Sequence, residues 1–211
     1  DLDAGLRLDE NYTVSEYGQI FLDIHNPRVK PATQQSYKYS MRIINEHLGS
    51  RKIASLKPYD IEKFLLQMES CGYSDSTISK LRGLLYMILQ HALGSDLVRK
   101  NVVSFAEKAR KRPPVEKSCF TEEEVNLLMQ HLPHDRIGWS IRLLLTTGLR
   151  QQELLALCRN HISPDGSTIN VCQAVSRVVG TAQISSPKSF SSYRTVVVPE
   201  NVRYCAIALR E

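Results

Sequence analysis

The sequence has 211 residues, of which 42% are hydrophobic and 23% are charged, and its formal net charge is +5. This composition is typical of a globular protein with one large domain or two small ones, and no apolar run is long enough to cross a membrane. Five scattered cysteines without a CxxC pair argue against a disulfide framework and a zinc ribbon, and they favour free thiols in a reducing cytoplasm.

The basic residues are concentrated in two segments. Residues 28–57 hold seven basic residues and one acid, and residues 99–117 hold seven basic residues and two acids. Clusters of this kind fit a polyanionic partner such as DNA. The charge pattern also leaves open a plain alternative, which is the solvated surface of a mildly basic protein.

The first half of the chain has the pattern of amphipathic helices. Apolar residues recur at helical spacing in four segments, residues 14–24, 37–48, 58–68 and 75–93. Pro58 suits the first turn of the third helix, and Ser74 or Asp75 can cap the fourth. We therefore predict a bundle of four to five helices, over residues 1–108, that buries its own core.

The composition changes at ARKRPPVEKS, residues 109–118, where two prolines in a basic, polar stretch cannot continue a helix. We predict a linker there and a second domain over residues 119–211. Its first helix is predicted from Thr121 and Glu124, which have the spacing of a capping box, and from the acids in its first turn. An apolar helix, IGWSIRLLLTTG, is predicted next, followed by a third through GLRQQELLALCRN.

The periodicity then changes to that of strands. STINVCQAVSRVV and RTVVVP are rich in β-branched residues and predict two strands, joined by the polar stretch GTAQISSPKSFSSY. The whole chain is therefore predicted to be mainly α, with a small β-hairpin or sheet in its second domain.

Arg150 lies directly after a glycine turn and before a leucine-rich run. Gly148 permits a tight turn, which puts Arg150 in the first turn of the predicted helix, where a cation is mildly unfavourable but an anion is well bound. Glu153 can hold its guanidinium in one orientation. An ordinary surface pair between Arg150 and Glu153 is the alternative.

Two further features carry possible chemistry. Lys188 lies between the predicted strands, where Pro187 stiffens the chain and nearby serines offer hydroxyls to a phosphate; a solvated lysine is the alternative. His131 and His134 are the nearest approach to a metal motif, but Pro133 breaks the helix that would align them. We therefore expect a loop pair and no metal site.

The order of these features resembles the tyrosine recombinases, the phage-integrase family. TTGLRQQELLAL, residues 146–157, is similar to the family's first arginine box, and PKSFSSYRTVVVPE, residues 187–200, resembles the hairpin that carries its catalytic lysine. The resemblance covers roughly residues 12–211. It implies a SAM-like helical bundle that binds core-site DNA, followed by the first part of an α+β catalytic domain.

The resemblance implies site-specific DNA recombination through a 3′-phosphotyrosyl intermediate. Arg150 is then expected on the scissile phosphate, Lys188 as general acid, and Glu153 as support for the arginine helix. A guanidinium can bind two non-bridging oxygens bidentately, and a lysine near the phosphate can protonate the departing 5′-oxygen. No metal or other cofactor is required for this chemistry.

The family's second arginine box and its tyrosine nucleophile have no counterpart in residues 1–211. Tyr193 lies inside the lysine segment and Tyr204 shortly after it, so neither follows a second arginine box. We expect that the catalytic domain in this chain is incomplete, and that the chain binds DNA without cutting it.

The resemblance also implies a C-shaped clamp around double-stranded DNA, with self-association on the DNA, a nucleoid-associated place in the cytoplasm, and neither a membrane nor a small-molecule substrate as partner. The expected DNA contacts lie at two helix starts and in the linker, and they are Thr33, Gln34, Tyr37, Lys38, Ser76, Thr77, Ser79, Lys80, Arg110, Lys111 and Arg112. Plain N-capping is the alternative for each hydroxyl residue.

Two other functions stay open at this point. One is a naturally shortened, non-catalytic DNA-binding accessory or inhibitor of recombination, which the downstream reading frame separates from a recombinase fragment. The other is a helical interaction protein without nucleic acid, for which Arg150→Ala and Lys188→Ala change nothing beyond stability.

Overall fold

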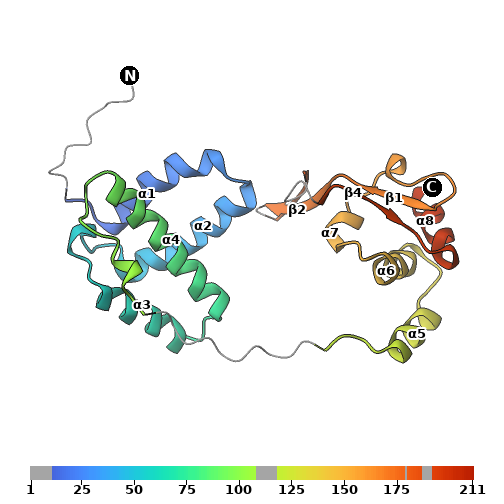
Figure 1. Cartoon of the computed structure of the whole chain (residues 1–211), viewed down its shortest axis with the longest axis horizontal. Helices are drawn as coiled ribbons and strands as arrows, with labels where there is room; N and C mark the ends of the chain where they lie inside the picture. The colour runs from blue at the N-terminus through green and yellow to red at the C-terminus, as the bar shows by residue number, and fades with distance from the viewer. Residues whose placement is uncertain (1–10, 108–117, 179, 187–191) are drawn as a thin grey trace, which may run out of the picture. The chain divides into compact units, whose positions relative to one another are not determined.

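The computed structural model of the chain describes residues 11–107, 118–178, 180–186 and 192–211. The chain divides into two compact units, an N-terminal unit of residues 1–115 and a C-terminal unit of residues 116–211 (Figure 1). Within the described residues, no helix is both long enough and apolar enough to span a bilayer.

The N-terminal unit is helical, as predicted. In residues 11–107, its elements are four α-helices and three single 3-10 turns: α1 (Val14–His25), η1 (Asn26–Arg28), α2 (Pro31–Leu48), η2 (Ile53–Ser55), α3 (Pro58–Ser70), α4 (Asp75–Gly94) and η3 (Val102–Ser104).

Local sequence fixes where these helices begin. The Thr13 hydroxyl accepts the Glu16 N–H, and the Glu16 carboxylate accepts the Thr13 N–H, which forms a capping box before α1. Pro58 occupies the first position of α3, where its missing N–H costs nothing. Ser74, one of the two predicted caps, begins α4 by accepting the Thr77 N–H at 3.3 Å.

The core of this unit is built around α4, which contacts α1, α2 and α3 and crosses α2 in Figure 1. Burial of each large apolar side chain stabilises the fold by about 1.5–3 kcal/mol, so the bundle has a core of its own. The largest fully buried side chains come from all four helices: Tyr17, Phe21, Ile43, Ile44, Ile61, Leu65, Met68, Leu81, Leu84, Leu85, Ile88 and Leu89.

In its described residues, the C-terminal unit combines short helices with two small sheets. Its elements are α5 (Glu122–His131), α6 (Arg136–Thr147), α7 (Gln151–Leu154), η4 (Arg159–His161), β1 (Thr168–Val171), β2 (Ala174–Val178), β3 (Thr181–Ser185), β4 (Arg194–Val197), η6 (Glu200–Val202) and α8 (Arg203–Arg210). The predicted capping box of α5 is present, because Thr121 and Glu124 exchange hydrogen bonds of 2.9 and 3.3 Å.

The strands differ from the prediction in two respects. The segment predicted as one strand breaks after Val171, and its two halves join different sheets: β1 pairs antiparallel with β4, and β2 pairs antiparallel with β3. Strand β3 was predicted as a polar connection. Its side chains are largely exposed, so backbone pairing alone is enough to form it, and an apolar pattern is not needed.

The helix predicted through GLRQQELLALCRN is also shorter than expected, since α7 ends at Leu154. The Gln173 side chain donates a hydrogen bond to the Ala156 carbonyl, which a longer helix would use internally. Ala156 is itself buried, and the chain leaves the helix by Cys158 in an extended conformation. The hydrogen bond from Gln173, which follows β1, therefore takes the place of a helical backbone hydrogen bond at Ala156.

Candidate functional site

The turn between α6 and α7 places Arg150 at the surface. Helix α6 ends at Gly148, whose φ of +64° lies in the left-handed region that glycine adopts without strain. Leu149 is buried in the core of the C-terminal unit and anchors the turn. Arg150 then stands as the N-cap of α7 with an extended backbone, rather than inside the first turn as predicted.

Glu153 fixes both the backbone and the side chain of Arg150. Its carboxylate accepts the Arg150 backbone N–H at 2.9 Å and the Arg150 Nη1 at 2.8 Å. The Glu153 side chain is 4% exposed, whereas the Arg150 side chain is 69% exposed. A buried carboxylate therefore holds one edge of an otherwise open guanidinium.

A second arginine, Arg194 from the first position of β4, also binds Glu153. Arg194 Nη1 donates to Oε1 at 3.1 Å and Nη2 donates to Oε2 at 2.9 Å, in the bidentate geometry typical of arginine and carboxylate. Sequence reasoning missed Arg194, because its contact with Glu153 depends on how the strands fold back onto α7. The available signal was a cation, Arg194, directly before the β-branched run TVVV.

The two arginines set the ionisation of Glu153. The hydrogen bonds from Arg194, together with those from the backbone and side chain of Arg150, lower the pKa of Glu153 from its usual 4.5 to about 2, against the opposing effect of burial. Glu153 is therefore a carboxylate at neutral pH. Two guanidinium groups and one carboxylate leave this cluster with one net positive charge.

This charge is available to an anion through Arg150. Within the described part of the chain, Arg150 uses only Nη1 for side-chain hydrogen bonds, and 69% of its side chain is exposed to solvent. The open edge has the planar, two-donor geometry that matches two oxygens of a phosphate. The predicted support of Arg150 by Glu153 is thus geometrically present, although its role stays a prediction.

Other predicted site residues lie outside the described residues. These are Lys188, the expected general acid, and the linker residues Arg110, Lys111 and Arg112.

The predicted DNA contacts on α2 differ in how free they are. Gln34 Nε2 donates to the Asn26 and Val29 carbonyls at 2.8 and 3.3 Å, so it closes the turn before its own helix. Tyr37 is half-buried against the core of the N-terminal unit. Thr33 is half-exposed and Lys38 is exposed. Lys38 is therefore the member of this group that is most open to a phosphate.

The predicted contacts on α4 are open to solvent, with one exception. Ser76, Ser79 and Lys80 are exposed. Thr77 is half-exposed, and its hydroxyl lies 2.9 Å from the Ser74 hydroxyl at the helix start. Ser74 is the N-cap of this helix, and among the expected contacts only the Thr77 hydroxyl is seen to touch the cap in the described residues.

Arg142 on α6 is a contrasting cation in the same unit. It is buried, and its guanidinium donates to the Pro133, Met129 and Leu132 carbonyls at 2.8, 3.1 and 2.7 Å. These carbonyls lie at or just beyond the C-terminal end of α5, where the helix dipole favours a positive charge. Arg142 thus caps a neighbouring helix.

The two histidines of the possible metal motif have separate neighbours. His131 Nδ1 lies 2.9 Å from the Leu127 carbonyl, and the His134 ring lies near that of Tyr204. Over the residues that the structure covers, no group of three or more His, Cys, Asp or Glu side chains is placed to hold a metal ion.

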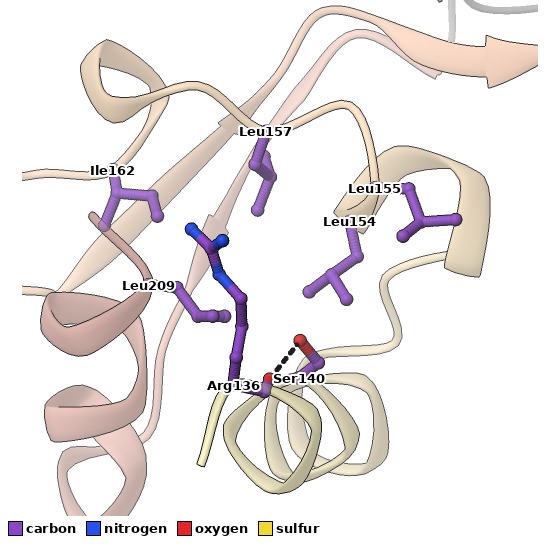
Figure 2. Close-up of a pocket in the computed structure, with 7 residues that line it drawn as sticks. All are labelled: Arg136, Ser140, Leu154, Leu155, Leu157, Ile162 and Leu209. Carbon is purple, nitrogen blue, oxygen red and sulfur yellow. Dashed lines mark hydrogen bonds between the residues drawn. The ribbon is translucent and has the colours of Figure 1, made fainter. Parts of the chain in front are cut away.

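A cavity of about 330 Å³ in the C-terminal unit lies apart from this chemistry. Figure 2 shows the Arg136 side chain extending between apolar side chains, with the Ser140 hydroxyl donating to the Arg136 carbonyl at 2.7 Å. None of Arg150, Glu153 and Arg194 lines it, so the cavity contributes no group to the arginine site. Its lining residues are Arg136, Ser140, Leu154, Leu155, Leu157, Ile162 and Leu209.

Comparisons of the sequence with known proteins identify the N-terminal unit first. Residues 13–68 match the family described as phage integrase, N-terminal SAM-like domain. The transposase of transposon Tn916 from Enterococcus faecalis is 30% identical over 181 residues, which are 82% of this chain and 45% of the transposase. A XerC-like tyrosine recombinase from Caldanaerobacter subterraneus subsp. tengcongensis is 27% identical over 189 residues, covering 82% and 48%. The chain thus spans about half the length of these relatives.

Solved structures extend the likeness to the fold. The Tn1549 transposon integrase, in complex with a circular intermediate DNA, matches with a TM-score of 0.74 and 26% identity over 90% of this chain and 63% of that one. A lambda integrase dimer bound to a core site matches in fold, with a TM-score of 0.65 and 17% identity over 84% and 49%. The helical bundle, the arginine box and these relatives agree in what the chain resembles, which is the tyrosine recombinases of the phage integrase family.

Proposed function

We propose that this chain is the DNA-binding part of a site-specific tyrosine recombinase, in which Arg150 binds the phosphate that is cut. The observation that carries the proposal is the cluster of Arg150, Glu153 and Arg194. A buried carboxylate holds one edge of the Arg150 guanidinium, while 69% of the side chain stays exposed and the cluster keeps one net positive charge. An ordinary surface pair lacks the second arginine and the buried carboxylate.

The chemistry of recombination explains why such a cluster is useful. Attack on a phosphodiester adds negative charge to the non-bridging oxygens, and a guanidinium fixed in advance stabilises that charge without reorganisation. Lys188, placed by the resemblance in the role of general acid, would donate the proton that the departing 5′-oxygen needs. The proposal assigns no nucleophile to residues 1–211, and it requires no metal.

The N-terminal unit is proposed to hold the duplex through the starts of α2 and α4. Lys38 and Lys80 are exposed, and so are Ser76 and Ser79, whose hydroxyls lie in the first turns of α4. Lysines and hydroxyl groups near helix starts suit phosphate oxygens. The Tn1549 integrase, which matches 90% of this chain and 63% of its own, is bound to DNA in its solved structure, and this supports the assignment. Arg110, Lys111 and Arg112 are proposed as further phosphate contacts.

Binding of the chain to a fluorescently labelled DNA duplex tests the proposal. We expect binding whose affinity falls steeply as salt is raised from about 50 to 200 mM, because phosphate contacts release counterions. Lys38→Gln and Lys80→Gln should each lower the slope of log affinity against log salt by about 1. Lys63→Gln is the matched control, since Lys63 is an exposed lysine of α3 with no assigned contact. Absence of binding to any duplex at low salt, including the ends of the mobile element, would refute the proposal.

A further inference from the structure

Arg194 is more tightly engaged than Arg150. Both of its terminal nitrogens bind the two oxygens of Glu153, and Nη1 also lies 3.3 Å from the Ser192 carbonyl. Its side chain is 30% exposed, against 69% for Arg150. Few N–H groups of the Arg194 guanidinium therefore remain to bind a ligand.

Arg150 and Arg194 share the Glu153 carboxylate, and this sharing decides which of the two positive charges remains available to a ligand. Arg194 occupies both carboxylate oxygens, and Arg150 Nη1 shares Oε1 at 2.8 Å. With Arg194 present, Glu153 is neutralised by a partner that faces inward, and the positive charge of Arg150 remains for a ligand. Without Arg194, the carboxylate would have Arg150 as its only arginine, and the net charge of the pair would be zero.

Strand pairing holds Arg194 in this position. Arg194 lies opposite Val171 in the β1–β4 pair, and Val171 is buried in the core of the C-terminal unit. The guanidinium thus extends from a strand whose register is fixed by a buried neighbour, and it reaches a carboxylate on a different element. A residue on rigid structure that fixes a ligand-binding group through a shared partner is a common device of functional sites.

We propose that Arg194 is the positioning residue of the arginine site: it saturates Glu153, and so keeps the Arg150 guanidinium oriented, with its positive charge left uncompensated for a phosphate. Arg194 itself touches no phosphate. This inference rests on the proposed function, and it deepens that function by naming the residue that makes Arg150 available.

A double-mutant cycle on DNA binding tests this inference. The variants are Arg150→Ala, Arg194→Gln and the two combined, measured by fluorescence anisotropy on one duplex. We expect Arg194→Gln to weaken binding about fivefold in the wild-type background, since residues that share a partner couple at this level. In the Arg150→Ala background, the same substitution should change binding by less than about twofold, because the group that it positions is gone.

Two controls separate positioning from general effects of charge and folding. Arg203→Gln removes the same charge from the C-terminal unit, at an arginine that donates to the Val198 carbonyl and does not contact Glu153. Its effect should be equal in both backgrounds. Arg194→Lys keeps the charge without the bidentate fork, and it should recover part of the affinity. The fluorescence of Trp139, the single tryptophan, reports that the C-terminal unit of each variant is folded.

The outcomes are distinguishable. An equal loss from Arg194→Gln in both backgrounds, or wild-type affinity of Arg194→Gln beside a weakened Arg150→Ala, overturns this inference alone. Unchanged affinity and salt slope for Arg150→Ala overturns the proposed phosphate role of Arg150, and the inference with it.

Discussion

Arg142 and Arg150 lie in neighbouring helical segments of the same unit, and their surroundings are opposite. Arg142 is 4% exposed and gives its hydrogen bonds to the backbone carbonyls that end α5. The Arg150 side chain is 69% exposed and is held along one edge by a buried carboxylate. The partners separate the two roles. The Arg142 guanidinium is buried and binds backbone carbonyls, whereas most of the Arg150 side chain stays exposed to solvent although Glu153 holds one of its nitrogens.

The largest effect is expected at Arg142. Arg142→Ala removes a buried, charged donor that binds three backbone carbonyls, so the free energy of unfolding of the C-terminal unit should fall by about 3 kcal/mol. Urea unfolding followed by Trp139 fluorescence measures this change, because Trp139 packs against the core of that unit. A loss below about 1 kcal/mol would place Arg142 among ordinary surface cations and remove the contrast with Arg150.

The second effect concerns pH and Glu153. The pKa of Glu153 is about 2 in the folded protein and 4.5 without its partners. Because the folded state binds this proton more weakly, the stabilisation is fully present above pH 4.5 and is lost as the pH falls towards 2. Glu153→Gln should therefore lose less stability than the wild type over that window.

Thermal unfolding at a series of acidic pH values, read by Trp139 fluorescence, measures the difference between the two proteins. Hydrogen bonds from Ser163 and Ser167 lower the pKa of Asp165 to about 2 as well, but Asp165 is present in both proteins, so its contribution cancels in the difference. Parallel pH profiles for wild type and Glu153→Gln would show that the arginines do not hold the carboxylate.

A smaller effect on stability is expected at Gly148, in the turn that separates α6 from Arg150. Gly148→Ala should cost about 1 kcal/mol, because the position has a φ of +64° and the added methyl group meets no neighbour within 4 Å. Gly83→Ala, in open space within α4, is the control, and it should be neutral or stabilising by up to about 1 kcal/mol. Circular dichroism during urea unfolding compares the two. Equal changes in the free energy of unfolding for Gly148→Ala and Gly83→Ala would show that a side chain at position 148 causes no backbone strain.

The smallest effect on stability is expected at Arg150 itself. Arg150→Ala should change the free energy of unfolding by less than about 0.5 kcal/mol, since the side chain is largely exposed and Arg194 still neutralises Glu153. The same Trp139 unfolding curves test this. A loss as large as that of Arg142→Ala would assign Arg150 a structural role.

The sequence predicts the N-terminal unit well because its fold is carried by local patterns. Apolar residues at helical spacing become the buried faces of α1 to α4, and Thr121 with Glu124 begins α5 as the capping-box spacing indicates. Each of these features depends on residues within one or two turns of the chain, so periodicity and capping are enough to place them.

The features that escaped prediction depend on contacts between distant segments. α7 is short because Gln173 binds the Ala156 carbonyl, and β3 forms by pairing with β2 although its exposed side chains show no apolar pattern. Arg194 reaches Glu153 across 41 residues of sequence. The sequence predicted the pairing of Arg150 and Glu153 because both lie at the start of one helix. It did not predict Arg194, which completes their cluster from a distant strand.

The salt dependence of DNA binding by Arg150→Ala tests the central claim most directly. Affinity for one duplex is measured over a range of salt concentrations for wild type, Arg150→Ala and the control Arg203→Gln. If Arg150 binds a phosphate, its loss lowers the slope of log affinity against log salt by about 1 and weakens binding more than the loss of Arg203. A wild-type slope and affinity for Arg150→Ala would contradict the assignment of Arg150 as the phosphate contact.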